Sequence, residues 1–175
     1  SEIDDFPDHP FKVRDDEDMM QLVDSIKERG VITPATVRQK EDGRYELISG
    51  HRRKRACELA GMDTLRCEVV DLNRDEATSL MVESNYQRSQ ILPSEKAFAY
   101  KMRLEAMKRQ AGRPAKENVV PVGQNYSREV LASQIGDSQT QIQRYVRLTN
   151  LVPELLECVD DGRMKMRPAV ELSYL

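Results

Sequence analysis

Two short helical segments that meet at Gly136 restrict what the C-terminal half of the chain can form. Apolar residues recur at helical spacing through residues 127–135 and again through residues 139–148. Ala132 is small enough for a second helix to cross over it, and Gly136 tolerates the positive φ of a tight turn. Ile142 is an apolar side chain that can fill the angle between the two helices. This spacing predicts a helix-turn-helix.

The outward face of the second helix predicts contact with duplex DNA. The candidate DNA-binding residues are Ser138, Gln139, Thr140, Gln143, Arg144 and Arg147. Gln can bond an adenine edge, Arg a guanine edge, and Thr a thymine methyl group or a phosphate; Ser138 and the free amides at the helix start can hold a phosphate. A solvated helical hairpin has the same periodicity, but a polar face without Glu or Lys favours recognition. Ser127 is expected to cap the first helix, and Asp137 or Ser138 the second.

A second candidate site lies where a predicted strand ends at Gly50 and a basic helix begins. Gly50 lets the backbone approach a phosphate, the helix start offers free amides, and Arg52 and Arg53 supply charged donors. Cations at a helix N-terminus oppose the helix dipole, and a bound anion would offset that cost. A solvated basic turn is the alternative. The G-x-x-x-x-G-K-[ST] phosphate loop is absent, and His51 by itself says little about chemistry.

The remaining pattern predicts an α+β fold class, with a small α+β unit in front of an all-α unit. In the first unit we expect a helix at residues 15–29 capped by Asp15 or Asp16, strands at 36–38, 45–48 and 66–70, a hairpin turn at 41–43, a helix at 51–60, and a helix from Asn73 or Asp75 to Asn85. In the second we expect helices at 96–109 and from Pro153, with a linker at 111–124. The domains would be residues 1–92 and 93–175.

Charge and composition exclude several classes of protein. The net charge of −3 argues against a protein that coats DNA by charge alone, although residues 52–55 and 101–116 are basic. No apolar run approaches the roughly 20 residues of a membrane span. The three cysteines are far apart in the sequence, so neither a zinc site nor a disulfide framework is expected.

The two ends of the chain predict a piece of a longer protein. The first residue is Ser1 rather than Met, and residues 168–172 read as the start of a helix. The first 18 residues are rich in Asp and Glu. We interpret this acidic segment as a solvated tail rather than a partner-binding arm.

Three segments, in this order, resemble the ParB family of partition proteins. Residues 9–14 (HPFKVR) and 25–34 (SIKERGVITP) are similar to the family's N-P-Y-Q-P-R and S-I-x-x-x-G-x-x-x-P run. Residues 50–56 (GHRRKRA) are similar to its G-E-R-R-x-R-A box. Residues 84–88 (SNYQR) and 92–97 (LPSEKA) are similar to E-N-x-Q-R followed by L-x-P-x-E-x-A. The resemblance covers nearly the whole chain, with the helix-turn-helix where the family has its own.

The resemblance implies a ParB/sulfiredoxin-like domain and a protein that binds a centromere-like inverted repeat in plasmid or chromosome partition. It implies a CTP pocket whose occupancy closes an N-terminal gate and makes a clamp that slides on DNA. By position, the nucleotide-binding residues would be Arg14, Ser49, Gly50, His51, Arg52, Arg53, Asn85 and Arg88. Mg²⁺ would be a second cofactor, with Asn85 as a contact. A homodimer, a ParA-type ATPase partner and a cytoplasmic location on the nucleoid or a plasmid are also implied. The family's C-terminal dimerisation domain is absent from this sequence.

Three positions depart from the family pattern. Lys12 stands where the family has Gln, His51 where it has Glu, and Ser84 where the Glu of E-N-x-Q-R is expected near Mg²⁺ and the hydrolytic water. Glu83 is adjacent, but on a helix it points about 100° away. The sequence therefore predicts nucleotide binding, does not predict hydrolysis, and leaves the identity of the nucleotide open.

Two other functions use the same two domains or the same fold. The first is a ParB-like transcription regulator or nucleoid-occlusion factor. The second is an enzyme, because the fold around residues 50–53 is shared with sulfiredoxin-like proteins and some nucleotide-dependent kinases, which transfer phosphate. The downstream helix-turn-helix argues against the enzyme.

Overall fold

The chain packs as two compact units. The computed structural model describes residues 2–86, 91–112 and 124–175, and of residues 111–112 and 124–126 it describes only the backbone. Packing divides the chain into Ser1–Ser84 and Asn85–Leu175. The domain boundary that we expect after residue 92 stays a prediction. None of the described helices is long and apolar enough to cross a membrane.

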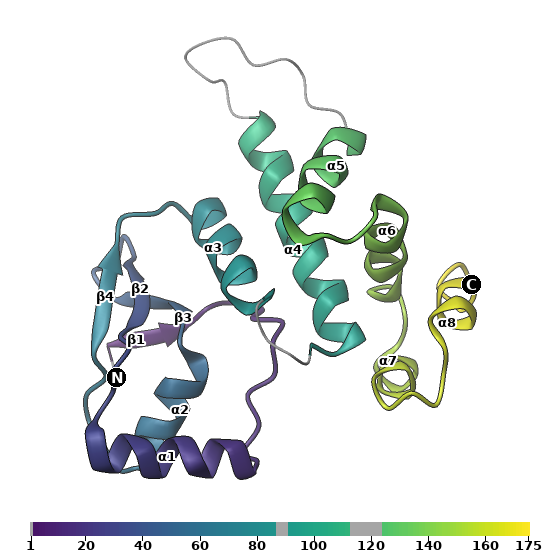
Figure 1. The fold of residues 1–175 in the computed structure, drawn as a ribbon. Coiled ribbons are helices and arrows are strands. Elements are labelled where there is room, and N and C mark those ends of the chain that lie inside the picture. Colours follow the sequence, from purple (N-terminus) through teal and green to yellow (C-terminus); the bar gives the residue numbers. More distant parts are fainter. Residues whose placement is uncertain (1, 87–90, 113–123) are drawn as a thin grey trace. The chain divides into compact units, whose positions relative to one another are not determined.

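A four-stranded mixed sheet forms the first unit, in the order β1-β3-β2-β4 (Figure 1). The strands are β1 (Ile3–Asp5), β2 (Ala35–Gln39), β3 (Tyr45–Ser49) and β4 (Cys67–Val70). The expected hairpin is confirmed, since β2 and β3 pair antiparallel. Both outer strands are parallel to their neighbours, β1 to β3 and β4 to β2.

The expectation of a solvated acidic tail is wrong for residues 3–5, because these residues form the edge strand β1. The amide of Tyr45 donates to the carbonyl of Glu2 at 3.0 Å, which extends the pairing of β1 with β3. Asp4 accepts hydrogen bonds from the Arg44 guanidinium and lies 2.7 Å from the Lys40 ammonium. These two cations hold the pKa of the Asp4 carboxyl well below its usual value.

Three helices complete the first unit: α1 (Glu17–Arg29), α2 (His51–Leu59) and α3 (Arg74–Tyr86), the last of which ends just inside the second unit. Asp16 is the N-cap of α1 and accepts from the amide of Met19 at 2.9 Å. Asn73 caps α3 through the amides of Asp75 and Glu76. The helices α1 and α2 lie side by side around a core of Met19, Val23, Ile26, Ala56 and Cys57.

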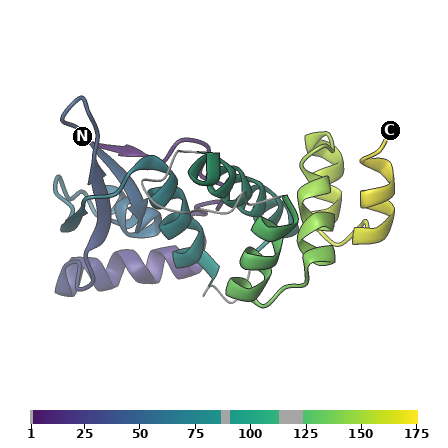
Figure 2. The same cartoon turned by 90° about the horizontal axis from the view of Figure 1, so that it is seen from above.

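The second unit consists of helices in the described residues. They are α4 (Pro93–Gly112), α5 (Gln124–Ile135), α6 (Gln139–Leu148), α7 (Pro153–Asp160) and α8 (Met166–Leu172). The long α4 contacts α5, α6 and α7, and α5 lies beside it in both views of the fold (Figures 1 and 2). One core joins α4, α5 and α6 through Tyr100, Leu104, Leu131 and Ile142. Most of the linker that we expect at residues 111–124 lies outside the described residues.

The helix-turn-helix spacing is confirmed. Ile142 is fully buried, Ala132 packs against the same core, and Gly136 turns the chain at a φ of 77°. Ser138 is the N-cap of α6, and its hydroxyl accepts from the amide of Gln141 at 3.2 Å. The expected Ser127 cap is wrong, because α5 begins three residues earlier at Gln124 and Ser127 is buried within it.

Candidate functional site

The turn between β3 and α2 places a glycine of positive φ directly before the start of a helix. Gly50 is in the left-handed region, with φ of 106°, and precedes the first residue of α2. A Cβ at this position would lie 2.8 Å from the Cβ of Ala35 in β2, so only glycine fits. The start of α2 carries no side-chain cap and no acidic residue in its first turn. A helix start of this kind can donate its amides to a ligand or to water.

Three of the four cations in α2 face carboxylates from the N-terminal segment. Arg52 lies 3.6 Å from Asp16, Lys54 lies 2.7 Å from Asp5, and Arg55 lies 2.5 Å from Asp15. The Asp15–Arg55 pair is bidentate, with a second contact of 3.0 Å, and the guanidinium lowers the pKa of the Asp15 carboxyl. These protein carboxylates supply negative charge around α2 that an external anion would otherwise supply.

Arg53 differs from its neighbours because it contacts backbone carbonyls. Its Nη1 donates to the carbonyls of Thr33 and Pro34 at 2.6 Å and 2.5 Å, just before β2. The guanidinium is half-buried, and this desolvation lowers its pKa, although an Arg stays charged. Arg53 thus stabilises the loop that leads into β2 through these two hydrogen bonds. Its predicted role in nucleotide binding stays a prediction.

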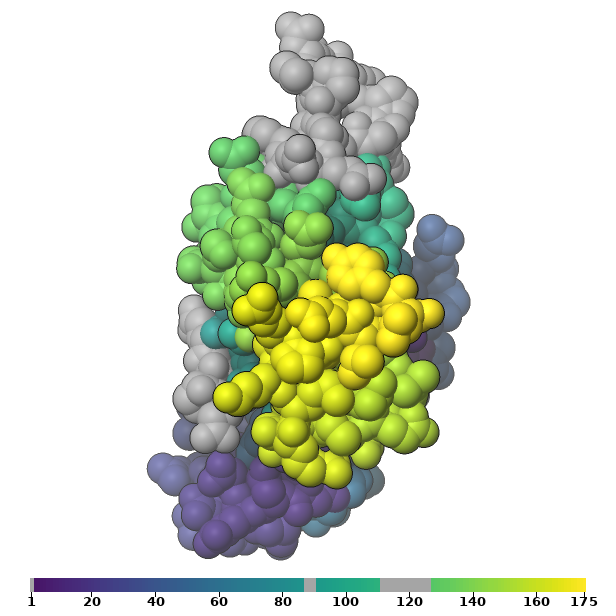
Figure 3. All heavy atoms as spheres, turned by 90° about the vertical axis from the view of Figure 1, so that its right-hand side faces the viewer, coloured from purple at the N-terminus to yellow at the C-terminus, as the bar shows by residue number. Residues whose placement is uncertain are grey.

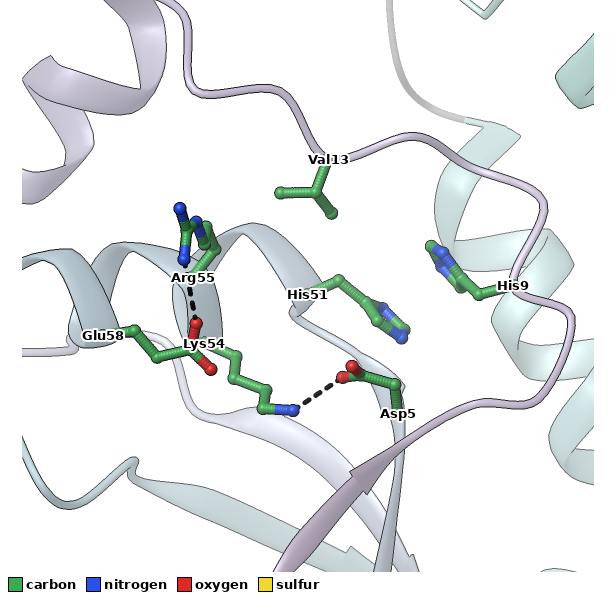
Figure 4. A pocket seen from close by; sticks show the side chains of 7 residues that line it. All are labelled: Asp5, His9, Val13, His51, Lys54, Arg55 and Glu58. Carbon is green, nitrogen blue, oxygen red and sulfur yellow. Dashed lines mark hydrogen bonds and ion pairs between the residues drawn. The ribbon is translucent and has the colours of Figure 1, made fainter. Parts of the chain in front are cut away.

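His9 and His51 line a pocket beside the first turn of α2. Their rings stack with centroids 3.6 Å apart, which fixes the N-terminal segment against α2. The pocket has a volume of about 210 Å³ and is lined by Asp5, His9, Val13, His51, Lys54, Arg55 and Glu58 (Figure 4). The sequence places His9 only within the segment of residues 9–14. Its stacking on His51, 42 positions along the chain, is a tertiary contact that no local pattern predicts.

The other predicted nucleotide ligands are spread over the chain. Arg14 is exposed and Ser49 is half-buried, both in the first unit. Asn85 belongs to the second unit, where its side chain is buried. Arg88 lies outside the described residues. Among the residues that the structure describes, no group of three His, Cys, Asp or Glu side chains could hold a metal ion, so Mg²⁺ stays a prediction.

The predicted DNA-reading face of α6 is largely open to solvent. Ser138, Gln139, Thr140, Gln143 and Arg144 are all exposed. Arg147 is half-buried, and its guanidinium lies 3.5 Å from the centre of the Tyr174 ring. A hydrogen bond attaches the α5–α6 turn to α4, because Asp137 in the turn accepts from the buried Tyr100 hydroxyl at 2.5 Å. Burial and this acceptor raise the pKa of Tyr100.

Comparisons with known proteins find similar sequences and a similar fold. The family model of the ParB N-terminal domain matches residues 1–86. The chromosome-partitioning protein Spo0J of Thermus thermophilus is 32% identical over 90% of this chain and 52% of its own length. A nucleoid occlusion protein of a Geobacillus species is 31% identical over 86% of this chain and 47% of its own. The chain therefore spans about half the length of these curated relatives.

The fold is similar to that of a solved partition protein. The crystal structure of C-terminally truncated ParB from Caulobacter crescentus, complexed to the centromeric parS site, matches with a TM-score of 0.58 and 24% identity. The match covers 98% of this chain and 80% of that one. At this level of identity the likeness confirms the α+β fold with a helical second part.

Proposed function

Because the chain belongs to the ParB family, through its N-terminal domain, we propose that it is a sequence-specific DNA-binding protein of plasmid or chromosome partition. The observation that carries this proposal is the α5–α6 turn, whose second helix exposes Gln139, Thr140, Gln143 and Arg144 to solvent. A helix of this kind enters the major groove and contacts base edges with its N-terminal residues. The relatives named for chromosome partitioning support the same function.

The DNA site of this proposal is a centromere-like inverted repeat bound by a homodimer. The Caulobacter relative is complexed to a centromeric site, which guides the choice of DNA. Two copies of one helix-turn-helix related by a two-fold axis read two half-sites of opposite orientation. A ParA-type ATPase would be the partner that moves this complex, on the nucleoid or on a plasmid.

The nucleotide site of this proposal is the Gly50 turn. CTP would place phosphate oxygens at the uncapped start of α2, where Gly50 leaves room for close approach and Arg52 lies at the edge. The nucleotide would then compete with Asp16 for Arg52, and with Asp5 and Asp15 for the next cations of α2. Nucleotide binding would release the N-terminal segment from α2. The released segment would then be free to move and close the N-terminal gate. Mg²⁺ would bind through the phosphates.

A second function is favoured by one observation. The Geobacillus nucleoid occlusion protein is nearly as similar to this chain as the Thermus partitioning protein, at 31% against 32% identity. A nucleoid-occlusion factor or transcription regulator would use the same two domains. A neighbouring gene for a ParA-type ATPase would favour partition.

Selection from a random-sequence duplex library tests the proposal and identifies the DNA site in the same experiment. The protein is incubated with the library at physiological salt, and bound duplexes are amplified and sequenced over several rounds. The proposal expects enrichment of one inverted repeat with half-sites about one helical turn apart, or a multiple of that distance. A pool without an enriched sequence, with the protein folded and the duplexes bound, would contradict it. The same selection is carried out with the Arg144→Ala variant as the matched comparison.

A further inference from the structure

A basic hollow lies beside α6 in the second unit. Its volume is about 190 Å³. It is lined by Leu104, Lys108, Arg128, Gln143, Val146 and Arg147. The three cations come from three different helices, α4, α5 and α6, which pack on one another around Leu104. Their convergence depends on the tertiary fold, since 39 residues separate Lys108 from Arg147 in the sequence.

The charge of this hollow fits an anion. Among the residues that the structure describes, its lining contains three cationic side chains, one amide and two apolar residues, with no carboxylate. Like charges that converge raise one another's energy, and an anion bound between them offsets that repulsion.

Arg147 is held at this hollow by an aromatic ring. The centre of its guanidinium lies 3.5 Å from the centroid of the Tyr174 ring, a cation–π distance. Its Nε is buried and has no hydrogen-bond partner among the described residues. Tyr174 follows α8, which packs against α6, and the yellow surface of this C-terminal segment faces the viewer in Figure 3. A side chain fixed in this way is less free to reach a base edge than the exposed Arg144.

We propose that Lys108, Arg128 and Arg147 bind a backbone phosphate of the duplex that α6 reads. This inference rests on the proposed DNA binding and changes the role of Arg147 from reading a base to positioning the protein. Gln143 connects the two sites, because it lines the hollow and also lies on the exposed face of α6. Contacts to phosphate fix the register of a protein on the duplex, and base contacts then specify sequence.

The salt dependence of binding to a scrambled duplex tests this assignment, because phosphate contacts do not depend on sequence. Affinity is measured by fluorescence anisotropy between about 50 and about 200 mM salt. Each phosphate contact contributes about 0.9 to the slope of log K against log salt, or about 3.5-fold of the loss over this range. Lys108→Ala and Arg128→Ala should each reduce the slope, by up to that amount, and weaken specific and scrambled duplexes equally.

Arg163→Ala is the matched control. It removes the same charge from the same unit, and Arg163 is exposed and pairs with Asp161 outside the hollow. Its salt slope should equal that of the wild type. Equal slopes for Lys108→Ala, Arg128→Ala and Arg163→Ala would overturn the inference. Altered slopes with no preference for any sequence would instead overturn only the proposed specific function, and no binding of any duplex at low salt would overturn both.

Tyr174 provides a positioning test with a conservative rescue. Tyr174→Phe keeps the aromatic face over Arg147, and Tyr174→Leu removes it. The Leu variant should lose part of the salt slope and the Phe variant should not. Equal slopes in both variants would contradict the role of the ring. Thermal unfolding by circular dichroism checks that both variants fold.

A free anion is the other source of phosphate oxygens. Inorganic triphosphate is titrated calorimetrically into the wild type and into Lys108→Ala and Arg128→Ala. The inference expects the three proteins to bind it equally, because the proposed nucleotide site lies in the first unit. Loss of triphosphate binding with an unchanged duplex slope would assign the hollow to a free anion and overturn the inference.

Discussion

Asp16 has two roles that a conservative substitution separates. Its side chain caps α1 through the amide of Met19, and one of its oxygens lies 3.6 Å from Arg52. Asn is as good an N-cap as Asp but carries no charge. The capping role can therefore be kept while the charge facing Arg52 is removed.

Asp16→Asn should tighten the binding of CTP. The nucleotide no longer competes with a carboxylate for Arg52, and an exposed pair of this kind contributes up to about 1 kcal/mol, or roughly fivefold in affinity. Calorimetric titration of CTP, with ATP and GTP as controls, measures the change. Asp18→Asn is the matched variant, since Asp18 lies in the same first turn and is not the N-cap. Equal affinities for the wild type and both variants would remove Arg52 from the nucleotide site.

Arg144 is the side chain that we expect to read a base. It is exposed on α6, in contrast to the half-buried Arg147. Arg144→Ala should weaken the selected duplex by about 1–3 kcal/mol and leave the scrambled duplex nearly unchanged. Competition binding at fixed salt gives both affinities. An unchanged ratio of the two would mean that Arg144 contacts no base.

The pairing of Asp15 with Arg55 predicts how stability depends on pH. Arg55 lowers the pKa of the Asp15 carboxyl in the folded protein, so the pair stabilises the fold above the unfolded pKa and loses this effect as the pH falls through the folded pKa. The melting temperature of the wild type should exceed that of Asp15→Asn at about pH 6, and the difference should shrink towards about pH 2. A difference that is constant with pH would show that the ion pair does not stabilise the fold.

At the scale of elements, local patterns predicted most of the secondary structure. The hairpin of β2 and β3 and the turn between α5 and α6 follow from periodicity and glycine placement, which are local properties. The strand β1 was not predicted, because Ile3–Asp5 contains two acidic residues and pairs with β3 across about 40 residues. Its charges are satisfied by Arg44, Lys40 and Lys54, which only the fold brings near.

The Gly50 turn is the element on which the nucleotide proposal depends. Gly50→Ala would place a Cβ 2.8 Å from Ala35 at a φ of 106°. Gly43→Ala is the matched control, because that residue also has a positive φ but no atom lies near its Cβ. Both variants incur about 1–2 kcal/mol of backbone strain, and Gly50→Ala should cost more because β2 must shift. Urea unfolding compares them, and equal stabilities would contradict the close contact between Gly50 and β2.

The candidate sites show a similar division between local and tertiary information. The exposed face of α6 could be read from the sequence, since helical periodicity determines which side chains point outward. The hollow of Lys108, Arg128 and Arg147 could not, because three helices contribute to it. The carboxylates opposite α2 were also missed. Their partners lie 36 to 49 residues away, as with Asp16 and Arg52 or Asp5 and Lys54.

The two units of the chain have separate cores and separate proposed ligands. The first unit packs around Met19, Val23 and Ala56, and the second around Tyr100, Leu131 and Ile142. Variants of the Gly50 turn should therefore change nucleotide affinity and leave sequence-specific DNA binding intact. Variants of α6 should change DNA affinity and leave nucleotide affinity intact.

The ratio of affinities for a selected inverted repeat and a scrambled duplex at physiological salt decides whether α6 reads DNA sequence. Competition anisotropy with the unmodified chain gives this ratio without any assumption about nucleotide or partner. A sequence-specific reader should bind the selected duplex about 10³-fold or more tightly. A ratio near one, with the chain folded and both duplexes bound, would mean that α6 is a solvated helix and that the chain does not read DNA sequence.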